Sequence, residues 1–354
     1  MRNGTRKAAG MLCALLAAVG VTCVALRLPA GAGRKAAVAA AGFILPAGNT
    51  DGFFSEEEED DGSSSSQAQN NGPQTSSSSP SSSSGAASSG KAGSPSSGAQ
   101  SSSGKVVEMC VGNSGTRVGN MWVRNSTSKN AALNLNAELQ KAPAVKIRRN
   151  DGPQVLIYHT HTTEAFAGDT RTTDKARSVC AVGDRIAAQL TAGGIGVVHD
   201  TTYHDYPAYD GSYDRSRVTM QNDLKKYPTI QVTLDIHRDA MHRDDGTALK
   251  TTTVVNGKKA AQLMIISGCD DDGTLKYPNW EYNLRLALRF QKALSDTYPS
   301  LARPLDFCAR KYNQDMTKGS LLIEIGTDVN TLDEAEYTGE LLGKVLAQVL
   351  GGMT

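Results

Sequence analysis

The sequence predicts an α/β domain, an open and mostly parallel sheet covered by helices on both faces, which follows a transmembrane anchor and a disordered linker. Three observations support this prediction. In the C-terminal half, short and nearly continuous apolar runs alternate with helical segments, as expected for strands buried on both faces. A long apolar run without charged residues lies near the N-terminus. A tract rich in Ser, Gly and Pro separates that run from the rest of the chain.

Residues 1–30 are expected to form a basic cytoplasmic tip and a transmembrane anchor. The apolar run from Ala8 to Leu26 contains no charged residue, and basic residues precede it. A helix of this length is about 28 Å long, close to the thickness of the hydrocarbon core of a bilayer. The preceding basic residues predict that the N-terminus stays in the cytoplasm. A cleavable signal peptide is the alternative, but the run is long for one and no clear cleavage site follows it.

Residues 31–104 are expected to be a disordered linker. They contain an acidic run from Glu56 to Asp61, followed by a tract of mainly Ser, Gly and Pro. Such a composition buries too little apolar surface to offset the entropy lost on ordering. About 50 residues of this type reach roughly 40 Å on average, so the linker would hold the folded part away from the bilayer. Residues 105–144 are expected to form a partly ordered approach segment, in which residues 131–141 are compatible with a helix.

Residues 145–354 are expected to form the catalytic domain. Its candidate strands are Gln154–His159, Ile195–His199, Ile230–Ile236, Gln262–Ser267 and Leu321–Ile325. Helices are predicted between and after them. Arg177–Thr191 ends at two glycines, which commonly stop a helix, and Trp280–Tyr298 carries one apolar stripe. The last helix begins at Thr331, which has the capping-box spacing to Glu334.

The charge and the cysteines disfavour two kinds of site. The formal net charge is +1 at pH 7, whereas nucleic-acid binding needs a clustered excess of Lys and Arg. The cysteines beyond the anchor lack Cys-x-x-Cys spacing, which disfavours a zinc site built from thiolates. The sequence leaves open whether these cysteines form disulfides or remain thiols.

Three strand exits carry the candidate functional residues. In open α/β sheets, ligands bind at the carboxyl ends of the strands. The polar groups found there are His159, His161 and Glu164 after the first strand, His237, Arg238 and Asp239 after the third, and Glu324 within the last. Of the remaining histidines, His199 and His204 are expected to be surface or substrate-side groups, and His242, five positions after His237 in a polar turn, is a disfavoured candidate ligand.

Two histidines and an acid at these exits indicate metal chemistry. A catalytic zinc commonly takes two His and a carboxylate and leaves one position for water. The metal lowers the pKa of that water and polarises the scissile carbonyl, while a nearby carboxylate moves the proton. By this argument His161, His237 and one acid would be the ligands, and Glu324 would carry the proton. The alternatives are strand-end histidines that only form hydrogen bonds, and a salt bridge from Glu324 to Arg238 or Arg310, because an unpaired carboxylate in a core strand costs several kcal/mol.

Five motifs, in order along the chain, carry a resemblance to a known family. They are Val155–Glu164, Thr233–Ala240, Leu301–Pro304, Tyr312–Asp315 and Leu321–Gly326. Together they resemble the motifs of the stage II sporulation protein P family, and the resemblance covers about residues 145–350. An N-terminal anchor followed by a variable tether is also similar to that family.

The resemblance implies a cell-wall hydrolase of endospore-forming bacteria that acts during engulfment of the forespore. Such an enzyme would cleave the amide between N-acetylmuramic acid and L-alanine and also cut peptide cross-links. It would be a single-pass protein of the cytoplasmic membrane, held there by the N-terminal helix, with its catalytic domain on the extracytoplasmic side at the sporulation septum. Peptidoglycan would be the substrate. The implied partners are a lytic transglycosylase that cleaves glycan strands and a membrane scaffold.

The wider zinc amidase family, which the chain also resembles, implies roles for individual residues. When the motifs of that family are aligned with this sequence, two of the family's metal ligands correspond to His161 and His237, and its catalytic carboxylate corresponds to Glu324. Its third ligand is a Glu at the start of the next helix, and this chain has no Glu there. Glu164 is then the first choice for the third ligand and His159 the second. His159 is otherwise expected to support the site or bind substrate. Arg238 and Asp239 are expected to orient the ligands or bind substrate, with a simple pairing of the two as the alternative.

The predicted function is therefore that of a membrane-anchored, zinc-dependent peptidoglycan amidase and endopeptidase. A tethered wall-binding or scaffold module with a decayed hydrolase site is the alternative, because of the altered third-ligand position. A metal-independent hydrolase is disfavoured, since no Ser or Cys lies in a recognisable nucleophile turn.

Overall fold

A computed structural model describes residues 105–131 and 133–353 of the chain. The predicted anchor and linker lie outside these residues. Among the residues that are described, no helix is both long enough and apolar enough to cross a membrane.

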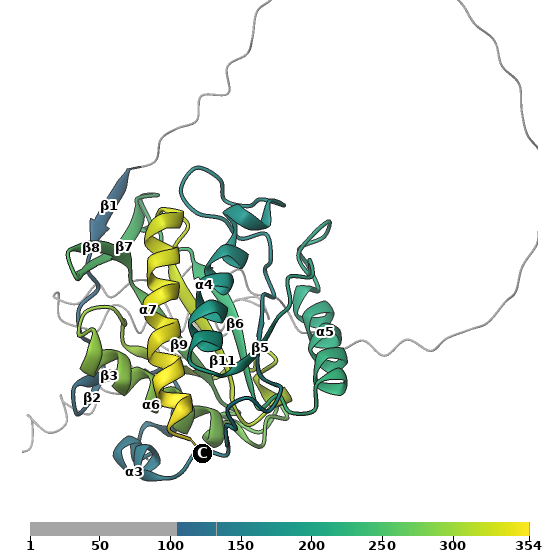
Figure 1. Ribbon diagram of the computed structural model, residues 1–354. Coiled ribbons are helices and arrows are strands. Elements are labelled where there is room, and N and C mark those ends of the chain that lie inside the picture. The colour runs from purple at the N-terminus through teal and green to yellow at the C-terminus, as the bar shows by residue number, and fades with distance from the viewer. Residues whose placement is uncertain (1–104, 132, 354) are drawn as a thin grey trace, which may run out of the picture. The chain divides into compact units, whose positions relative to one another are not determined.

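The structure is built on an eight-stranded sheet with the order β2-β3-β10-β9-β11-β6-β4-β5 (Figure 1). Its strands are β2 (Thr116–Val118), β3 (Met121–Asn125), β4 (Pro153–Tyr158), β5 (Gly196–His199), β6 (Val232–Asp239), β9 (Leu263–Gly268), β10 (Leu305–Cys308) and β11 (Ser320–Thr327). Neighbouring strands are parallel except in the pairs β2–β3 and β9–β11. The predicted open, mostly parallel sheet is confirmed. A separate three-stranded sheet consists of β1 (Val106–Met109), β7 (Ala248–Val255) and β8 (Lys258–Ala261).

Helices cover both faces of the large sheet. These are α4 (Val179–Ala192), α6 (Trp280–Thr297) and α7 (Leu332–Gly351) on one face, and α5 (Ser212–Lys226) on the other. The short helix α3 (Leu135–Gln140) lies against α6, and three 3-10 turns complete the elements: η1 (Ser128–Ala131), η2 (Lys175–Arg177) and η3 (Gln314–Met316).

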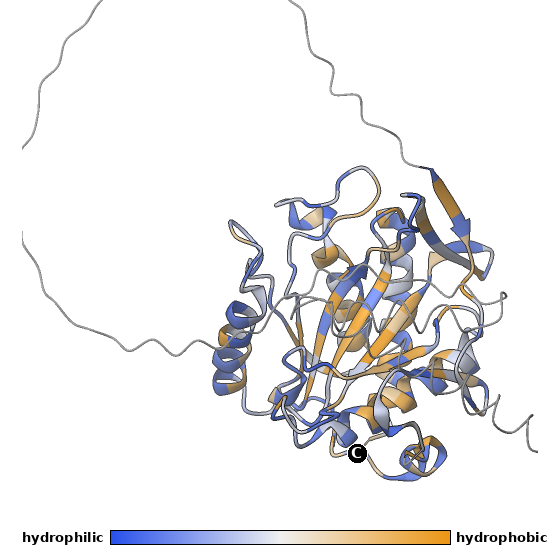
Figure 2. Cartoon of the chain, turned by 180° about the vertical axis from the view of Figure 1, so that it is seen from behind, coloured by the Kyte–Doolittle hydropathy of each residue, from blue (hydrophilic) through white to orange (hydrophobic). Residues whose placement is uncertain are grey.

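The two faces follow from side-chain alternation along the strands. In β4, Val155 and Ile157 pack into the main core with α4, α6 and α7, whereas Leu156 and Tyr158 pack with Met220 of α5. Figure 2 shows the central strands in mainly hydrophobic colours, as expected for a sheet covered on both sides.

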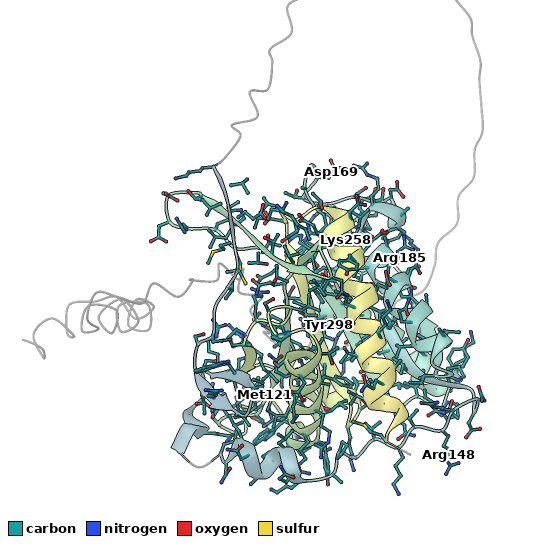
Figure 3. The ribbon with its side chains drawn as sticks, turned by 60° about the vertical axis from the view of Figure 1, so that its left-hand side comes forward. Met121, Arg148, Asp169, Arg185, Lys258 and Tyr298 are labelled. Atoms are coloured by element: carbon teal, nitrogen blue, oxygen red, sulfur yellow. The ribbon has the colours of Figure 1, made fainter. Side chains whose placement is uncertain are left out.

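Helices α4 and α7 lie side by side at unusually close range (Figure 1). A Cβ atom on Gly339 of α7 would lie 2.9 Å from the carbonyl oxygen of Val182 in α4, so only glycine fits there. Figure 3 shows Arg185 of α4 beside α7, where its Nη2 lies 3.1 Å from Oε2 of Glu336. The glycine therefore allows a close approach of the two helices, and the Arg185–Glu336 ion pair adds a side-chain contact between them.

Several elements differ from the expectation. Helix α5 was not predicted, because its i, i+4 stripe consists of Ser212, Ser216 and Met220 and gives almost no apolar periodicity. The hairpin β7–β8 and strand β10 were also missed. Residues 116–125 add β2 and β3 to the large sheet, which ties part of the expected approach segment to the main fold.

The first prediction concerns the start of α7. Thr331 Oγ1 accepts a hydrogen bond from the backbone N–H of Glu334 at 3.3 Å, and Glu334 Oε2 accepts one from Thr331 N–H at 3.0 Å. Thr331→Ala removes one acceptor and should lower the free energy of unfolding by about 1 kcal/mol, measured by urea denaturation. Thr331→Ser keeps the hydroxyl and should stay close to wild type. Equal stability of the Ala and wild-type chains would contradict this role.

Candidate functional site

The predicted site residues meet at one end of the sheet, where His237 and Glu324 lie on the face opposite α4, α6 and α7, whereas His159 lies on the face that α4 covers. His159, His161 and Glu164 follow β4, His237 and Asp239 belong to β6, and Glu324 belongs to β11. Strand register places His237 directly beside Glu324, because β6 and β11 are parallel neighbours. Segments far apart in the sequence thus meet at one end of the sheet.

His237 is buried between two carboxylates. Its Nδ1 lies 3.4 Å from Glu164 Oε2, and its Nε2 lies 2.9 Å from Asp235 Oδ1. Burial disfavours a charged imidazole, but the Asp235 and Glu164 carboxylates outweigh it and raise the pKa of His237 well above its ordinary value. The surroundings of this ring therefore favour a positive charge.

The carboxylates beside His237 are held by other bonds. Glu164 Oε2 accepts a hydrogen bond from the backbone N–H of Arg238 at 3.1 Å. Burial opposes ionisation of Glu164, but the charge on His237 prevails and lowers the pKa of Glu164 to about 2. Asp235 accepts hydrogen bonds from Thr160 N–H at 2.8 Å and Thr160 Oγ1 at 2.6 Å. Both acids are therefore ionised and fixed.

Asp235 was not among the predicted site residues. The signal was present, because residues two apart on a strand share a face, and Asp235 precedes His237 by two positions. A carboxylate on the second nitrogen of a ligating histidine is a common way to orient such a ring.

His161 lies against His237, and one of its ring nitrogens has no hydrogen-bond partner. Its ring is perpendicular to that of His237, with centroids 5.3 Å apart, and is stacked on Tyr209 at 4.5 Å. Nδ1 is buried without a hydrogen-bond partner, and burial lowers the pKa of His161 to about 4. A neutral imidazole with a buried, unpartnered nitrogen is either a source of instability or a ligand donor.

His159 is occupied within the protein. Its Nδ1 donates to the carbonyl oxygen of Ile236 at 2.7 Å, and its Nε2 lies 2.8 Å from Nε2 of His199. His199 Nδ1 in turn lies 2.8 Å from Asp184 Oδ1. Because Nδ1 carries the proton in the neutral ring, the lone pair on Nε2 of His159 faces Nε2 of His199. Both nitrogens of His159 are therefore in use.

This histidine pair presses against the backbone of α4. A Cβ atom on Gly183 would lie 2.5 Å from His199 Nε2 and 3.0 Å from His159 Nε2. Any larger residue at this position would displace the pair.

Glu324 is half-buried and poorly solvated. Its Oε2 is buried and has no hydrogen-bond partner. Burial, together with the nearby charge of Asp239, raises the pKa of Glu324 well above its ordinary value. Asp239 is paired with the buried Arg303, whose Nη1 lies 2.8 Å from Asp239 Oδ2. The carboxyl group of Glu324 can therefore hold a proton.

Arg238 does not neutralise Glu324. Its Nε donates to the carbonyl oxygen of Ala165 at 3.0 Å, and its Nη2 donates to that of Thr170 at 2.9 Å. The side chain of Arg238 thus braces the loop after β4, and its backbone N–H holds Glu164.

Two other histidines lie outside the cluster. His204 is buried rather than exposed, with Nδ1 2.7 Å from the carbonyl oxygen of His159 and Nε2 2.8 Å from Thr219 Oγ1. The expectation of a surface group at His204 was wrong, because a histidine in a polar loop can still satisfy both nitrogens internally. His242 lies 3.4 Å from Asp328 Oδ2.

The donor atoms in the cluster are of the types that bind zinc, although their side chains are not arranged as a complete coordination site. Within residues 105–131 and 133–353, no group of three or more His, Cys, Asp or Glu side chains is arranged to hold a metal ion. Two donors on a tetrahedral zinc lie roughly 3.3–3.6 Å apart. His237 Nδ1 and Glu164 Oε2 are 3.4 Å apart, and His161 supplies an unpartnered nitrogen beside them. The residue types and this spacing fit zinc.

These features define an α/β protein whose histidine and carboxylate side chains converge at one end of a mostly parallel sheet. A family model described as Stage II sporulation protein P matches residues 49–347, and the chain belongs to that family. The family expected from the sequence motifs is confirmed.

Known relatives and solved structures are similar to parts of the chain. Stage II sporulation protein P of Bacillus subtilis (strain 168) is 30% identical over 229 residues, which is 59% of this chain and 54% of that protein. The match thus spans about half of that relative's length. The N-acetylmuramoyl-L-alanine amidase AmiC2 of Nostoc punctiforme matches with a TM-score of 0.34 and 14% identity over 56% of this chain and 96% of its own. An N-acetylmuramoyl-L-alanine amidase from Clostridium difficile 630 matches with a TM-score of 0.31 and 17% identity over 57% and 94%.

A buried aspartate holds the loop that carries His161 and Glu164. Asp205 Oδ2 accepts hydrogen bonds from Thr163 Oγ1 at 2.7 Å and Arg171 Nη1 at 2.9 Å, and Oδ1 accepts from Thr163 N–H at 3.1 Å. This role could not be predicted from the sequence, since Asp205 lies in a polar, tyrosine-rich stretch far from Thr163.

The second prediction tests this anchor. Asp205→Ala leaves the buried Thr163 N–H and the Arg171 guanidinium without their acceptor, and should lower the free energy of unfolding by about 2–3 kcal/mol. Asp210→Ala removes an exposed carboxylate from the same loop and should change it by less than about 0.5 kcal/mol. Chemical denaturation of both variants provides the comparison, and equal effects would exclude a specific anchoring role.

Proposed function

We propose that this chain is a zinc-dependent peptidoglycan hydrolase that cleaves the amide between N-acetylmuramic acid and L-alanine and also cuts peptide cross-links. It would act during forespore engulfment, anchored in the cytoplasmic membrane with residues 145–354 outside it. A lytic transglycosylase and a membrane scaffold are the partners that the family resemblance implies. Family membership supports the sporulation setting.

The observation that carries the proposal is the convergence of His161, His237 and Glu164 beside Glu324. These residues come from the β4 loop, β6 and β11, and nothing in local chain geometry requires them to meet. Asp235 and Glu164 surround one imidazole with two negative charges, which favours a cation at this position.

Each residue of the cluster then has a chemical role. His161, His237 and Glu164 would hold zinc, and Asp235 would orient His237 through its second nitrogen. Bound zinc would supply Lewis acidity toward the amide carbonyl and a water of lowered pKa. Glu324 would take the proton from the attacking water and hand it to the leaving amine. The raised pKa of Glu324 suits the second half of this transfer, because a carboxyl group that retains its proton can act as an acid.

The third prediction concerns the proton carrier. Glu324→Gln keeps the shape of the side chain but removes its basicity, and should reduce the release of stem peptides from purified sacculi by at least about 100-fold. Zinc content should not change. Glu340→Gln, a matched change on the exposed face of α7, should leave the rate unaltered. Near-normal hydrolysis by the Glu324 variant would exclude the assigned role.

The fourth prediction separates the two candidates for the third ligand. Glu164→Ala should lower the zinc bound per chain as strongly as His161→Ala and His237→Ala, because all three would remove a donor. His159→Gln should retain stoichiometric zinc, since both nitrogens of His159 already bond within the protein. Elemental analysis of the purified full chain measures this.

Zinc loss in the His159 variant, with zinc retained in the Glu164 variant, would reverse the assignment. A wild-type chain without stoichiometric zinc would instead favour the wall-binding alternative.

A further inference from the structure

A cavity of about 610 Å³ lies next to the cluster. The loop after β4, residues 163–173, forms one wall, and the loop before α5, residues 205–210, forms the other. The lining combines threonine hydroxyls, two carboxylates, two tyrosine rings, a proline and a single arginine. It contains no aliphatic side chain larger than proline, so its apolar surface comes mainly from tyrosine rings and proline, beside polar groups.

The cavity is continuous with the candidate catalytic cluster. Tyr209 lines it and is also stacked on His161 at 4.5 Å. Thr163 lines it and lies two residues from His161 and one from Glu164. A group bound in this cavity would therefore lie next to the scissile bond of a substrate that is cleaved at His161 and His237.

One wall of the cavity carries an exposed aromatic side chain. Tyr206 is 57% exposed, one of the few large apolar groups that the described surface leaves in water. Its ring meets that of Tyr203 edge-on at 6.3 Å, and the Tyr203 hydroxyl donates to the carbonyl oxygen of Thr173 at 2.5 Å. Tyr206 is thus held at the cavity by the loop that faces it. Such a ring offers a flat apolar surface to a ligand that has both apolar and polar sides.

The charges in the cavity argue against an anionic ligand. Arg171 is the cation of the lining, and it is already paired with Asp205 and placed 4.1 Å over the Tyr209 ring. Asp210 adds a second negative charge at the rim. Stem peptides carry several carboxylates, so this wall would repel rather than attract them. A neutral ligand with many hydroxyl groups meets hydroxyl, carboxylate and guanidinium partners here.

We infer that this cavity binds the glycan side of peptidoglycan, with the C–H face of an N-acetylated amino sugar packed on Tyr206. The inference rests on the proposed function, because the scissile amide joins a sugar to a peptide and the cavity adjoins the cluster at His161. The sugar hydroxyl and acetamido groups bond to the threonines, Asp210 and the free edge of Arg171. The stem peptide then leaves the cluster in the other direction.

Binding of two separate probes to the full chain tests this assignment. One probe is glycan strands from which the stem peptides have been removed and whose lactyl carboxylates have been converted to neutral methyl esters, and the other is free stem peptides. Tyr206→Ala should weaken binding of the glycan strands roughly five- to tenfold and leave binding of the peptides unchanged. Tyr206→Phe keeps the ring and should bind within about twofold of wild type. Val254→Ala, a change at an exposed apolar residue of β7 outside the cavity, should have no effect.

A second measurement uses the unaltered chain. Glycan strands, but not stem peptides, should slow amide hydrogen exchange in residues 203–210. Unchanged glycan affinity in Tyr206→Ala, or a loss confined to the stem peptides, would overturn the inference. Neither probe contains the scissile amide, so these results stand apart from hydrolysis. A chain that binds glycan strands through Tyr206 but releases nothing from sacculi would refute the proposed function and leave the glycan site in place.

Discussion

The buried contact of His237 with Asp235 and Glu164 is the constraint on which the rest of the site depends. Ionised groups removed from water are tolerated only when they are paired and hydrogen-bonded, and removal of one partner leaves an uncompensated charge. Here the partners come from β6 and from the loop after β4, so the contact fixes that loop to the sheet. The orientation of His161 and the reach of Glu164 follow from it.

The fold was largely predictable from the sequence, but unevenly so. Strands β4, β9 and β11 contain nearly continuous apolar runs, and such runs indicate burial on both faces. The capping box at Thr331 also formed as its spacing predicted. Helix α5 could not be found by hydrophobic periodicity, because the stripe that it buries consists of serines and one methionine, which packs against Leu156 and Tyr158 of β4.

The residues of the candidate site were predictable from the sequence only where they lie at the carboxyl ends of predicted strands. His161, His237 and Glu324 follow from the rule that ligands gather at the carboxyl ends of strands. The choice between Glu164 and His159 could not be made from spacing, because His159 is fixed by the Ile236 carbonyl and by His199, neither of which is near in sequence. The role of Asp205 could not be predicted either, because Thr163, with which it forms hydrogen bonds, is also far away in the sequence.

The absence of a side chain at Gly183 links the site to the outer layer of the molecule. Next to it in α4, Val182 receives the close approach of Gly339 from α7, while Gly183 itself bears on His199 and His159. The backbone of α4 thus supports His159 and His199 from behind, and α7 contacts that same backbone at Gly339. The packing of α7 on α4, one layer away from the site, therefore bears on the position of His159 beside β6.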